Sequence, residues 1–346
     1  MINWVPNKTI DNKLINKFIS LSLNINQFTN YGPLVKILEN KIKNILKITD
    51  DKSIIITNSG TSALHALGSG IELYHKKNFK WATQSFTFPP SAQGPFKNVL
   101  IVDIDNGGSL DINCIADDIE AIIVTNIFGN VSDLDKYVDF CNRTNKILIF
   151  DNAATPYTFY KGINCINYGT GSIISFHHTK PLGFGEGGAI IVDKKYESSI
   201  RCIMNFGINI NSETYYLSSG SNYKMSDIAA AYILQYLDKF DEIIDIHKKL
   251  YLYMIEKLKN IKGIYLFPNF SSEIPFLSCF CLLFDNYDDN IRLKLIENNI
   301  FCRKYYNPLK NTPKTVEFFD KILCVPCNKD MLFDDIDKII DLIENI

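Results

Sequence analysis

Runs of consecutive apolar residues and helically spaced apolar residues alternate over residues 53–192. The runs predict buried strands, because strands covered on both faces lack polar alternation. Such runs lie at residues 53–57, 99–102, 121–125, 147–150, 173–176 and 189–192, with a further strand and loop at 81–88. Helical spacing predicts helices at residues 34–47, 63–74 and 132–144. Strands that alternate with helices predict a three-layer α/β domain on a mainly parallel sheet.

The same two patterns continue to the C-terminus and indicate a second, smaller α/β unit. A helix at 200–206 and a polar loop at 208–224 precede a long helical zone that opens at Met225. Beyond it we expect strands at 264–267, 276–284 and 322–325, and helices at 290–298 and 332–345. We therefore expect a large domain over residues 1–238, including the N-terminal segment, and a small C-terminal domain over 239–346.

Composition and charge narrow the class of protein. The chain has 346 residues, of which 46% are hydrophobic and 21% are charged, as in ordinary globular proteins. A net charge of −2 offers nucleic acid no basic surface. We found no apolar run of the roughly 18 residues that a membrane helix requires, and the N-terminus MINWVPNKTI lacks the apolar centre of a signal peptide. We therefore expect a cytoplasmic protein that binds neither nucleic acid nor a membrane.

Cysteine spacing gives no indication of a metal site. The nine cysteines are scattered, which is typical of free thiols in a reducing compartment. The C-x-x-C string Cys324–Cys327 has no second pair and no nearby histidine, so we interpret it as a buried strand end.

Candidate chemistry concentrates in residues 172–192, which read SIISFHHTKPLGFGEGGAIIV. Two apolar runs flank a glycine-rich connection, the pattern of a strand hairpin, and Lys180 lies on that connection. A lysine whose pKa is lowered by its surroundings can form an imine with a carbonyl group. The alternative is that Lys180 is an ordinary solvated lysine.

The glycines of this connection match the G-x-G-x-x-G string of dinucleotide-binding turns over residues 183–188. That string binds a pyrophosphate only where it follows a strand and opens a helix. Here it leads into the apolar run 189–192, which predicts a strand. We therefore reject the dinucleotide interpretation.

Two further strand ends carry polar groups. Asn58-Ser59-Gly60-Thr61-Ser62 joins a strand to a helix, where free backbone N–H groups and the helix dipole favour an anion; Thr61 or Ser62 could instead only cap the helix. Asp151 ends the strand at 147–150, with capping of the next turn as its alternative role. Ligands of α/β domains gather at the carboxyl ends of strands, so we expect these segments to converge near Lys180.

Taken together, these segments resemble the DegT/StrS-type sugar-nucleotide aminotransferases, which use pyridoxal phosphate in the aspartate aminotransferase fold (fold type I). The order and spacing of seven strings carry the resemblance over nearly the whole chain. They are Tyr31-Gly32-Pro33, Ser59-Gly60-Thr61-Ser62-Ala63-Leu64, Ser85-Phe86-Thr87-Phe88, Asp151-Asn152-Ala153, the segment from Ser175 to Ala189, Asn222-Tyr223-Lys224-Met225, and Arg303-Lys304-Tyr305-Tyr306-Asn307-Pro308-Leu309.

The resemblance implies a role for each matching residue. Lys180 would bind the cofactor covalently and then move the proton, and Asp151 would keep the pyridine nitrogen protonated. Phe88 would stack on the ring. The phosphate would be held by Gly60, Thr61 and Ser175, and by Asn222 of the neighbouring subunit of a homodimer. Substrate contacts would come from Tyr31, His177, His178, Lys224, Arg303 and Tyr305.

Two positions depart from the family pattern. Ala154 stands where the family usually has Gln or His near the phenolic oxygen of the cofactor, and Lys224 stands where it often has Arg, so bidentate geometry toward a diphosphate is lost. A branch of the family replaces the lysine by histidine and dehydrates its substrate. Lys180 is intact here, and we interpret His177 and His178 as wall residues or substrate contacts.

The expected reaction is amino transfer from L-glutamate to a dTDP- or UDP-linked 4-keto-6-deoxy sugar. The product would be a 4-amino-4,6-dideoxy sugar, of the viosamine type, for glycan synthesis. The alternatives are amination of a 3-keto-6-deoxy sugar and a catalytically silent ligand sensor.

Overall fold

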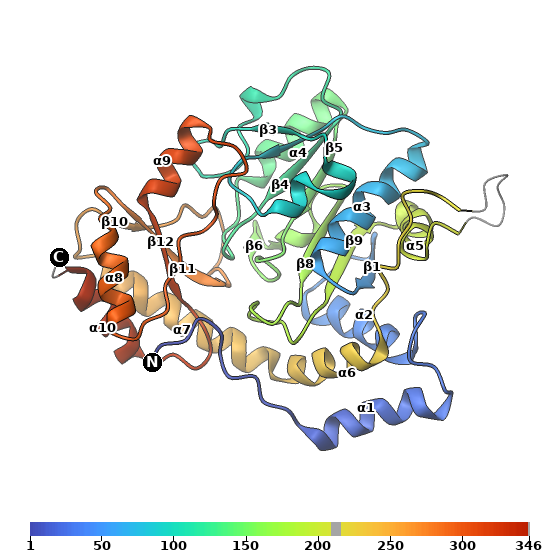
Figure 1. Cartoon of the computed structure of the whole chain (residues 1–346), viewed down its shortest axis with the longest axis horizontal. Coiled ribbons are helices and arrows are strands. Elements are labelled where there is room, and N and C mark those ends of the chain that lie inside the picture. The colour runs from blue at the N-terminus through green and yellow to red at the C-terminus, as the bar shows by residue number, and fades with distance from the viewer. Residues whose placement is uncertain (209–215, 345–346) are drawn as a thin grey trace.

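The computed structural model describes residues 1–208 and 216–344, and its centre is a mainly parallel β-sheet (Figure 1). Within these residues the sheet has seven strands in the order β1-β9-β8-β5-β4-β2-β3. Neighbours from β8 to β3 run parallel, whereas β9 runs antiparallel to both β8 and β1. The strands are β1 (Lys52–Thr57), β2 (Trp81–Gln84), β3 (Leu100–Val102), β4 (Ala121–Thr125), β5 (Ile147–Asp151), β8 (Gly171–Ser175) and β9 (Gly188–Asp193).

Alternate residues of these strands face two different hydrophobic cores, so helices cover both faces of the sheet. Ile56, Ile122 and Phe150 pack with α2, α4 and α6, whereas Ile55 and Ile123 pack with α3 and α5. This arrangement confirms the three-layer α/β architecture. The helices are α1 (Asn12–Asn24), α2 (Pro33–Ile45), α3 (Gly60–His75), α4 (Leu134–Thr144), α5 (Glu197–Met204) and α6 (Asp227–Tyr236).

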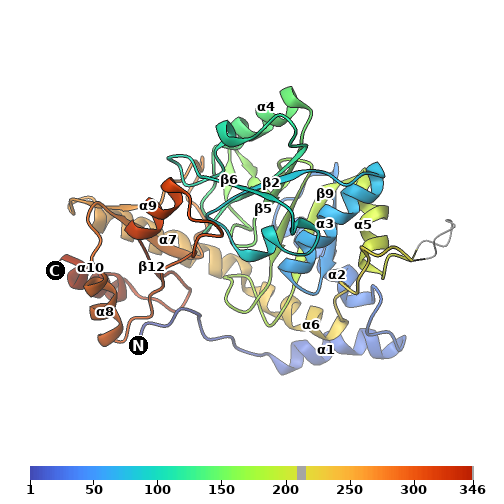
Figure 2. The same cartoon turned by 45° about the horizontal axis from the view of Figure 1, so that its top comes forward.

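The C-terminal part of the chain builds a second, antiparallel sheet with its own helices. Its strand order is β10-β11-β12, and α7 runs from the large sheet toward it in both views (Figures 1 and 2). Phe240 and Ile244 at the start of α7 belong to the core of the large sheet, whereas Leu250 and Met254 belong to the C-terminal core. The elements are α7 (Phe240–Leu258), β10 (Ile264–Leu266), β11 (Cys279–Phe284), α8 (Asp289–Glu297), α9 (Pro313–Lys321), β12 (Ile322–Pro326) and α10 (Phe333–Glu344).

Most elements lie where the hydrophobic pattern predicts them. Strands β8 and β9 form the expected hairpin. The glycine string 183–188 leads into β9 and not into a helix, which agrees with the rejection of a dinucleotide site. The long helical zone is interrupted by a 3₁₀ turn at Leu237–Lys239, and β11 begins later than expected. Helix α9 and the short hairpin of β6 (Phe159–Tyr160) and β7 (Ile163–Asn164) were not predicted. Residues 209–215 of the expected loop and residue 345 of the expected last helix lie outside the described residues.

Residues 1–11, here called the N-terminal segment, run from the C-terminal sheet to the start of α1 (Figure 1). Ile2 pairs with Ile300 and is buried in the C-terminal core. The segment therefore connects the two parts of the molecule before the first helix begins. None of the described helices is both long and apolar enough to span a membrane.

Candidate active site

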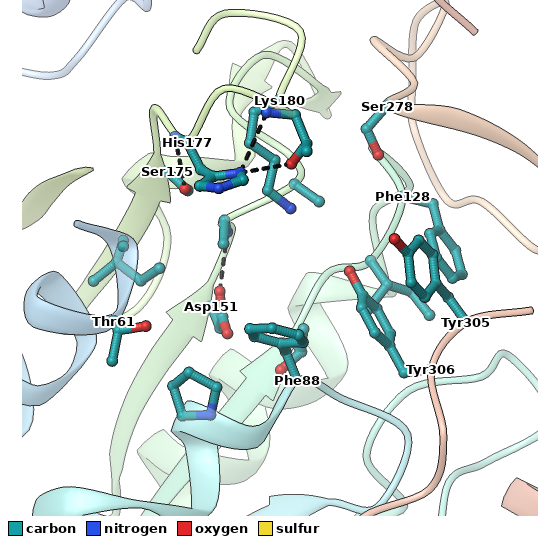
Figure 3. A pocket seen from close by; sticks show the side chains of 18 of the residues that line it. Thr61, Phe88, Phe128, Asp151, Ser175, His177, Lys180, Ser278, Tyr305 and Tyr306 are labelled. Carbon is teal, nitrogen blue, oxygen red and sulfur yellow. Dashed lines mark hydrogen bonds between the residues drawn. The ribbon is translucent and has the colours of Figure 1, made fainter. Parts of the chain in front are cut away.

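A pocket of about 410 Å³ lies where the carboxyl ends of β4, β5 and β8 meet the N-terminus of α3 and the C-terminal sheet. Thr61 and Ser175 lie on one side of it, and Tyr305 and Tyr306 lie on the other, with Asp151 between them (Figure 3). The pocket is also lined by Gly60, Phe88, His177, Lys180 and Arg303. The structure therefore confirms that these strand-end segments converge near Lys180, as the sequence predicted.

Lys180 lies in the turn between β8 and β9, and main-chain bonds fix that turn. The Lys180 N–H donates to the His177 carbonyl oxygen at 2.8 Å, and the Gly183 N–H donates to the Lys180 carbonyl oxygen at 3.0 Å. Burial lowers the pKa of the Lys180 amine, and the negative charge of Asp151 opposes that shift. Lys180 is half-buried and lines the pocket, which favours the functional interpretation over that of an ordinary solvated lysine. The lowered pKa leaves a larger share of the side chain as the neutral, nucleophilic amine.

Asp151 is the last residue of β5 and is only 4% exposed. Its Oδ1 accepts a hydrogen bond from the Ala153 N–H at 3.0 Å, so the turn-capping role is real. Burial raises the pKa of the carboxyl group, while the bond from Ala153 and the charge of Lys180 lower it. A buried carboxylate in a pocket favours a cationic or protonated partner.

The N-terminus of α3 is positioned by very close backbone packing. A Cβ atom on Gly60 would lie 2.9 Å from the Ser175 Cβ, and one on Gly188 would lie 2.5 Å from the Ser59 carbonyl oxygen. Ser59 is the N-cap, accepting from the Ser62 N–H at 3.1 Å. Thr61 therefore does not cap the helix and stays exposed at the pocket, beside free N–H groups suited to an anion.

Aromatic rings form the opposite wall of the pocket. Phe88 is 54% exposed, and its ring centroid lies 5.8 Å from that of Tyr306, which stacks on Phe128 at 5.4 Å. An exposed ring at the edge of a polar pocket suits a flat ligand.

Arg303 brings a cation to this wall. Its guanidinium lies over the Trp4 ring at 5.0 Å and donates to the hydroxyl oxygen of Tyr305. On the other side of the pocket, the His177 Nδ1 lies 2.8 Å from the Thr179 Oγ1. A stacked guanidinium facing a pocket suits a carboxylate or a phosphate.

Several lining residues were missed by reasoning from the sequence. Phe128 follows β4, so its place near a strand end could have marked it as a pocket residue. Tyr306 lies inside the family string that ends at Leu309, so that string could have marked it. No local pattern marks the others. The missed lining residues include Trp4, Phe128, Ser278, Cys279 and Tyr306.

Four predicted substrate or cofactor residues do not line this pocket: Tyr31, His178, Asn222 and Lys224. The Arg201 guanidinium lies 5.1 Å from the centroid of the Tyr31 ring, and His178 is exposed beside Phe184. The Lys224 Nζ donates to the Asn205 Oδ1 at 2.8 Å. Asn222 is exposed and accepts through its main-chain oxygen from the Asn58 side chain.

The residues of the pocket fit pyridoxal phosphate. The cofactor needs an amine for its carbonyl group, a carboxylate for its ring nitrogen, a surface for its ring and donors for its phosphate. Lys180, Asp151 and Phe88 supply the first three, and the α3 N-terminus with the Ser175 hydroxyl supplies the fourth. The Gly60–Ser175 approach leaves no room for a side chain where the donors gather.

Comparison with known proteins agrees with this geometry. Residues 9–344 match the DegT/DnrJ/EryC1/StrS aminotransferase family. The dTDP-4-amino-4,6-dideoxy-D-glucose transaminase of Shigella dysenteriae is 28% identical over 350 residues, which cover 92% of each chain.

Solved structures share the fold at low sequence identity. The aminotransferase PseC of Helicobacter pylori, involved in the biosynthesis of pseudoaminic acid, superposes with a TM-score of 0.84 at 17% identity, covering 99% of this chain and 98% of its own. The GDP-4-keto-6-deoxy-D-mannose-3-dehydratase of E. coli with bound hydrated pyridoxal phosphate gives 0.85 at 20% identity, covering 99% and 100%. The fold is type I of the pyridoxal phosphate enzymes. The chain belongs to the DegT/DnrJ/EryC1/StrS aminotransferase family and is a pyridoxal phosphate-dependent enzyme.

Proposed function

We propose that the protein transfers an amino group from L-glutamate to a nucleotide-linked 4-keto-6-deoxy sugar and forms a 4-amino-4,6-dideoxy sugar. The observation that carries this proposal is the pairing of Lys180, with its lowered pKa, and the buried Asp151 in one pocket. The name of the Shigella relative supports amination at C4 and dTDP as the nucleotide, with UDP as the alternative. We further propose a cytoplasmic protein whose product enters glycan synthesis.

Bound pyridoxal phosphate would supply the electron withdrawal that makes the substrate C–H bond acidic. The residues of the chain do the rest. The Lys180 Nζ, whose pKa is lowered by burial, would take the proton from the substrate carbon and return it. Asp151 would accept a hydrogen bond from the ring nitrogen and hold a proton there. Gly60, Thr61 and Ser175 would hold the phosphate.

Binding of the sugar nucleotide would draw on the open side of the pocket. Arg303 and Tyr305 on one wall and His177 on the other line the pocket and would contact the substrate. Asn222 and Lys224 do not line the pocket of their own chain, and we propose that they complete the pocket of a partner subunit in a homodimer. Tyr31 and His178 also do not line the pocket of their own chain, and we propose that they contact the substrate bound in the pocket of the partner subunit.

Three other functions are weighed against this one. Amination at C3 of a 3-keto-6-deoxy sugar would use the same residues, so the substrate that yields product in the assay separates the two reactions. Dehydration, the activity named for the E. coli neighbour, is disfavoured by the intact Lys180. A silent sensor is disfavoured because Lys180, Asp151 and Ser175 all lie in one pocket.

The test combines the purified protein with pyridoxal phosphate, glutamate and either dTDP- or UDP-4-keto-6-deoxyglucose, and detects the amino sugar by mass spectrometry. We expect product with one of the two nucleotides and none with the Lys180→Ala variant. A cofactor absorbance band that responds to glutamate, without product from either substrate, would move the proposal to a 3-keto sugar. A band that does not respond to glutamate would contradict glutamate as the amino donor.

A further inference from the structure

The N-terminal segment contacts the site from outside the two sheets. Trp4 lines the pocket against Arg303, and the Asn7 N–H donates to the Asp330 Oδ2 at 2.6 Å. At its far end the Asp11 N–H donates to the Gln235 Oε1 at 3.3 Å. The segment is thus attached to both parts of the molecule, with Lys8 between these attachments.

The side-chain amine of Lys8 donates hydrogen bonds to main-chain oxygens of the turn that carries Lys180. Its Nζ donates to the Gly183 carbonyl oxygen at 2.8 Å and lies 3.3 Å from the carbonyl oxygen of Lys180 itself. The same Nζ lies 4.0 Å from the centroid of the Tyr236 ring. Burial lowers the pKa of Lys8 to about 7, with a further lowering by Lys329 and an opposing effect of Asp330.

The turn at residues 177–187 is tight and largely self-bonded. A Cβ atom on Gly183 would lie 1.9 Å from the His177 carbonyl oxygen, and the His178 N–H donates to the Gly185 carbonyl oxygen at 2.7 Å. These internal bonds give the turn its shape. The turn is also held from outside, because Leu182 is buried in the large core and Phe184 stacks on Tyr232 of α6. The bonds from Lys8 add a polar attachment at the carbonyl oxygens of Lys180 and Gly183 themselves.

We propose that Lys8 is a positioning residue for Lys180: by donating to the carbonyl oxygens of Lys180 and Gly183, it fixes the point from which the Lys180 side chain enters the pocket. The inference rests on the proposed role of Lys180 in the reaction. It gives the N-terminal segment a part in catalysis, although Lys8 is not among the residues that line the pocket. Below pH 7 the amine is mostly protonated and these bonds are charge-assisted, and above pH 7 the neutral amine still donates to the two carbonyl oxygens.

Hydrogen exchange on the cofactor-free, full-length protein tests this contact directly. We expect the amides of residues 177–187 to exchange roughly tenfold or more faster in Lys8→Met, because both hydrogen bonds from Lys8 to the turn are lost. Lys239→Met is the matched control, because the Lys239 Nζ donates to the Thr9 Oγ1 of the same segment at 3.0 Å without contacting the turn. Unchanged exchange in Lys8→Met, or the same increase in Lys239→Met, would overturn the proposal.

The affinity for the cofactor gives a second readout, because a positioning role and a purely structural role of Lys8 predict different results for Lys8→Met and Lys8→Arg. Titration with pyridoxal phosphate, followed by visible absorbance, should show several-fold weaker binding in Lys8→Met. Binding should recover in Lys8→Arg, since a guanidinium can donate to both carbonyl oxygens. Equal loss in both variants would contradict positioning by hydrogen bonds. Neither measurement uses a sugar nucleotide, so a wrong substrate assignment would leave this result standing.

Discussion

Lys180 and Asp151 occupy one pocket, and burial favours the uncharged form of each. The pKa of Lys180 is lowered and that of Asp151 is raised, while each opposes the shift of the other through its charge. The two groups therefore depend on each other for their charge states, and a bound cationic ring would add to the stabilisation of the carboxylate. Substitutions at either residue should change chemistry more than folding.

Asp151→Asn should bind pyridoxal phosphate and fold normally, yet turn over roughly 10²–10⁴ times more slowly. An amide keeps the size of the side chain and can keep the bond from the Ala153 N–H, but it cannot hold a proton on the ring nitrogen. Steady-state kcat at saturating cofactor measures the loss. A kcat within a factor of a few of the native value would contradict the role of Asp151.

His247 is a buried base whose titration should limit stability in acid. Its Nδ1 lies 3.0 Å from the Leu277 carbonyl oxygen, and burial lowers its pKa from 6.5 to about 4. The unfolded chain therefore takes up a proton that the folded protein excludes, so the contribution is complete above pH 6.5 and is lost as the pH falls toward 4.

Between pH 7 and pH 5 this single residue should cost about 2 kcal/mol of unfolding free energy. Urea unfolding at both pH values measures the fall, and His247→Gln should show a smaller fall than the native chain. Equal pH dependence of the two proteins would show that His247 is not the group responsible.

At the scale of the elements, two aspartates cap helices that are far from them in the sequence. Asp227 accepts from the Leu34 and Val35 N–H groups of α2 at 3.0 and 3.2 Å. Asp103, after β3, accepts from the Thr315 N–H at 3.0 Å and caps α9 in the same way. A local search for capping residues cannot find such partners.

Asp227→Ala should destabilise the protein by roughly 2–4 kcal/mol, because buried N–H groups of α2 and the Ser22 hydroxyl would lose their acceptor. Chemical denaturation measures the change. Asp238→Ala, which removes the exposed partner of Lys41, is the control and should have little effect. A similar loss in both variants would contradict the capping role.

These caps explain how far the sequence predicted the elements. Helix α2 was predicted because Pro33 and a regular apolar face mark it, although its cap is distant. Helix α9 was missed because only Thr315 of its residues is buried and its cap, Asp103, comes from another part of the chain. The strands of the large sheet were predicted because consecutive buried residues leave a continuous apolar run.

At the scale of the whole molecule, the sequence predicted those site residues that lie at strand ends of the large sheet or at the start of α3. Lys180, Asp151 and Thr61 follow strand ends or open a helix, and the topology brings such positions together. Trp4 and Ser278 could not be predicted, because only the packing of the C-terminal sheet and the N-terminal segment against the large sheet brings them to the pocket. We propose that the domains divide near residue 238, just before α7 passes from one core to the other.

The proposed homodimer predicts complementation between two weakened chains. Lys180→Ala lacks its own amine, and Asn222→Ala would weaken only the pocket of its neighbour. Refolding the two variants together should restore activity through mixed dimers that hold one intact pocket. Activity no higher than the sum of the separate variants would contradict a shared site.

The first residues of the chain set a practical limit on how this protein can be handled. Met1 is 82% exposed, so a purification handle fused ahead of it should be tolerated. Trimming after Pro6, by contrast, would remove Ile2 from the C-terminal core and Trp4 from beneath Arg303 while leaving every helix and strand of the large sheet intact. Such a shortened protein should give a native-like circular dichroism spectrum and still have low activity. The integrity of the N-terminus should therefore be verified by intact mass before activities are compared.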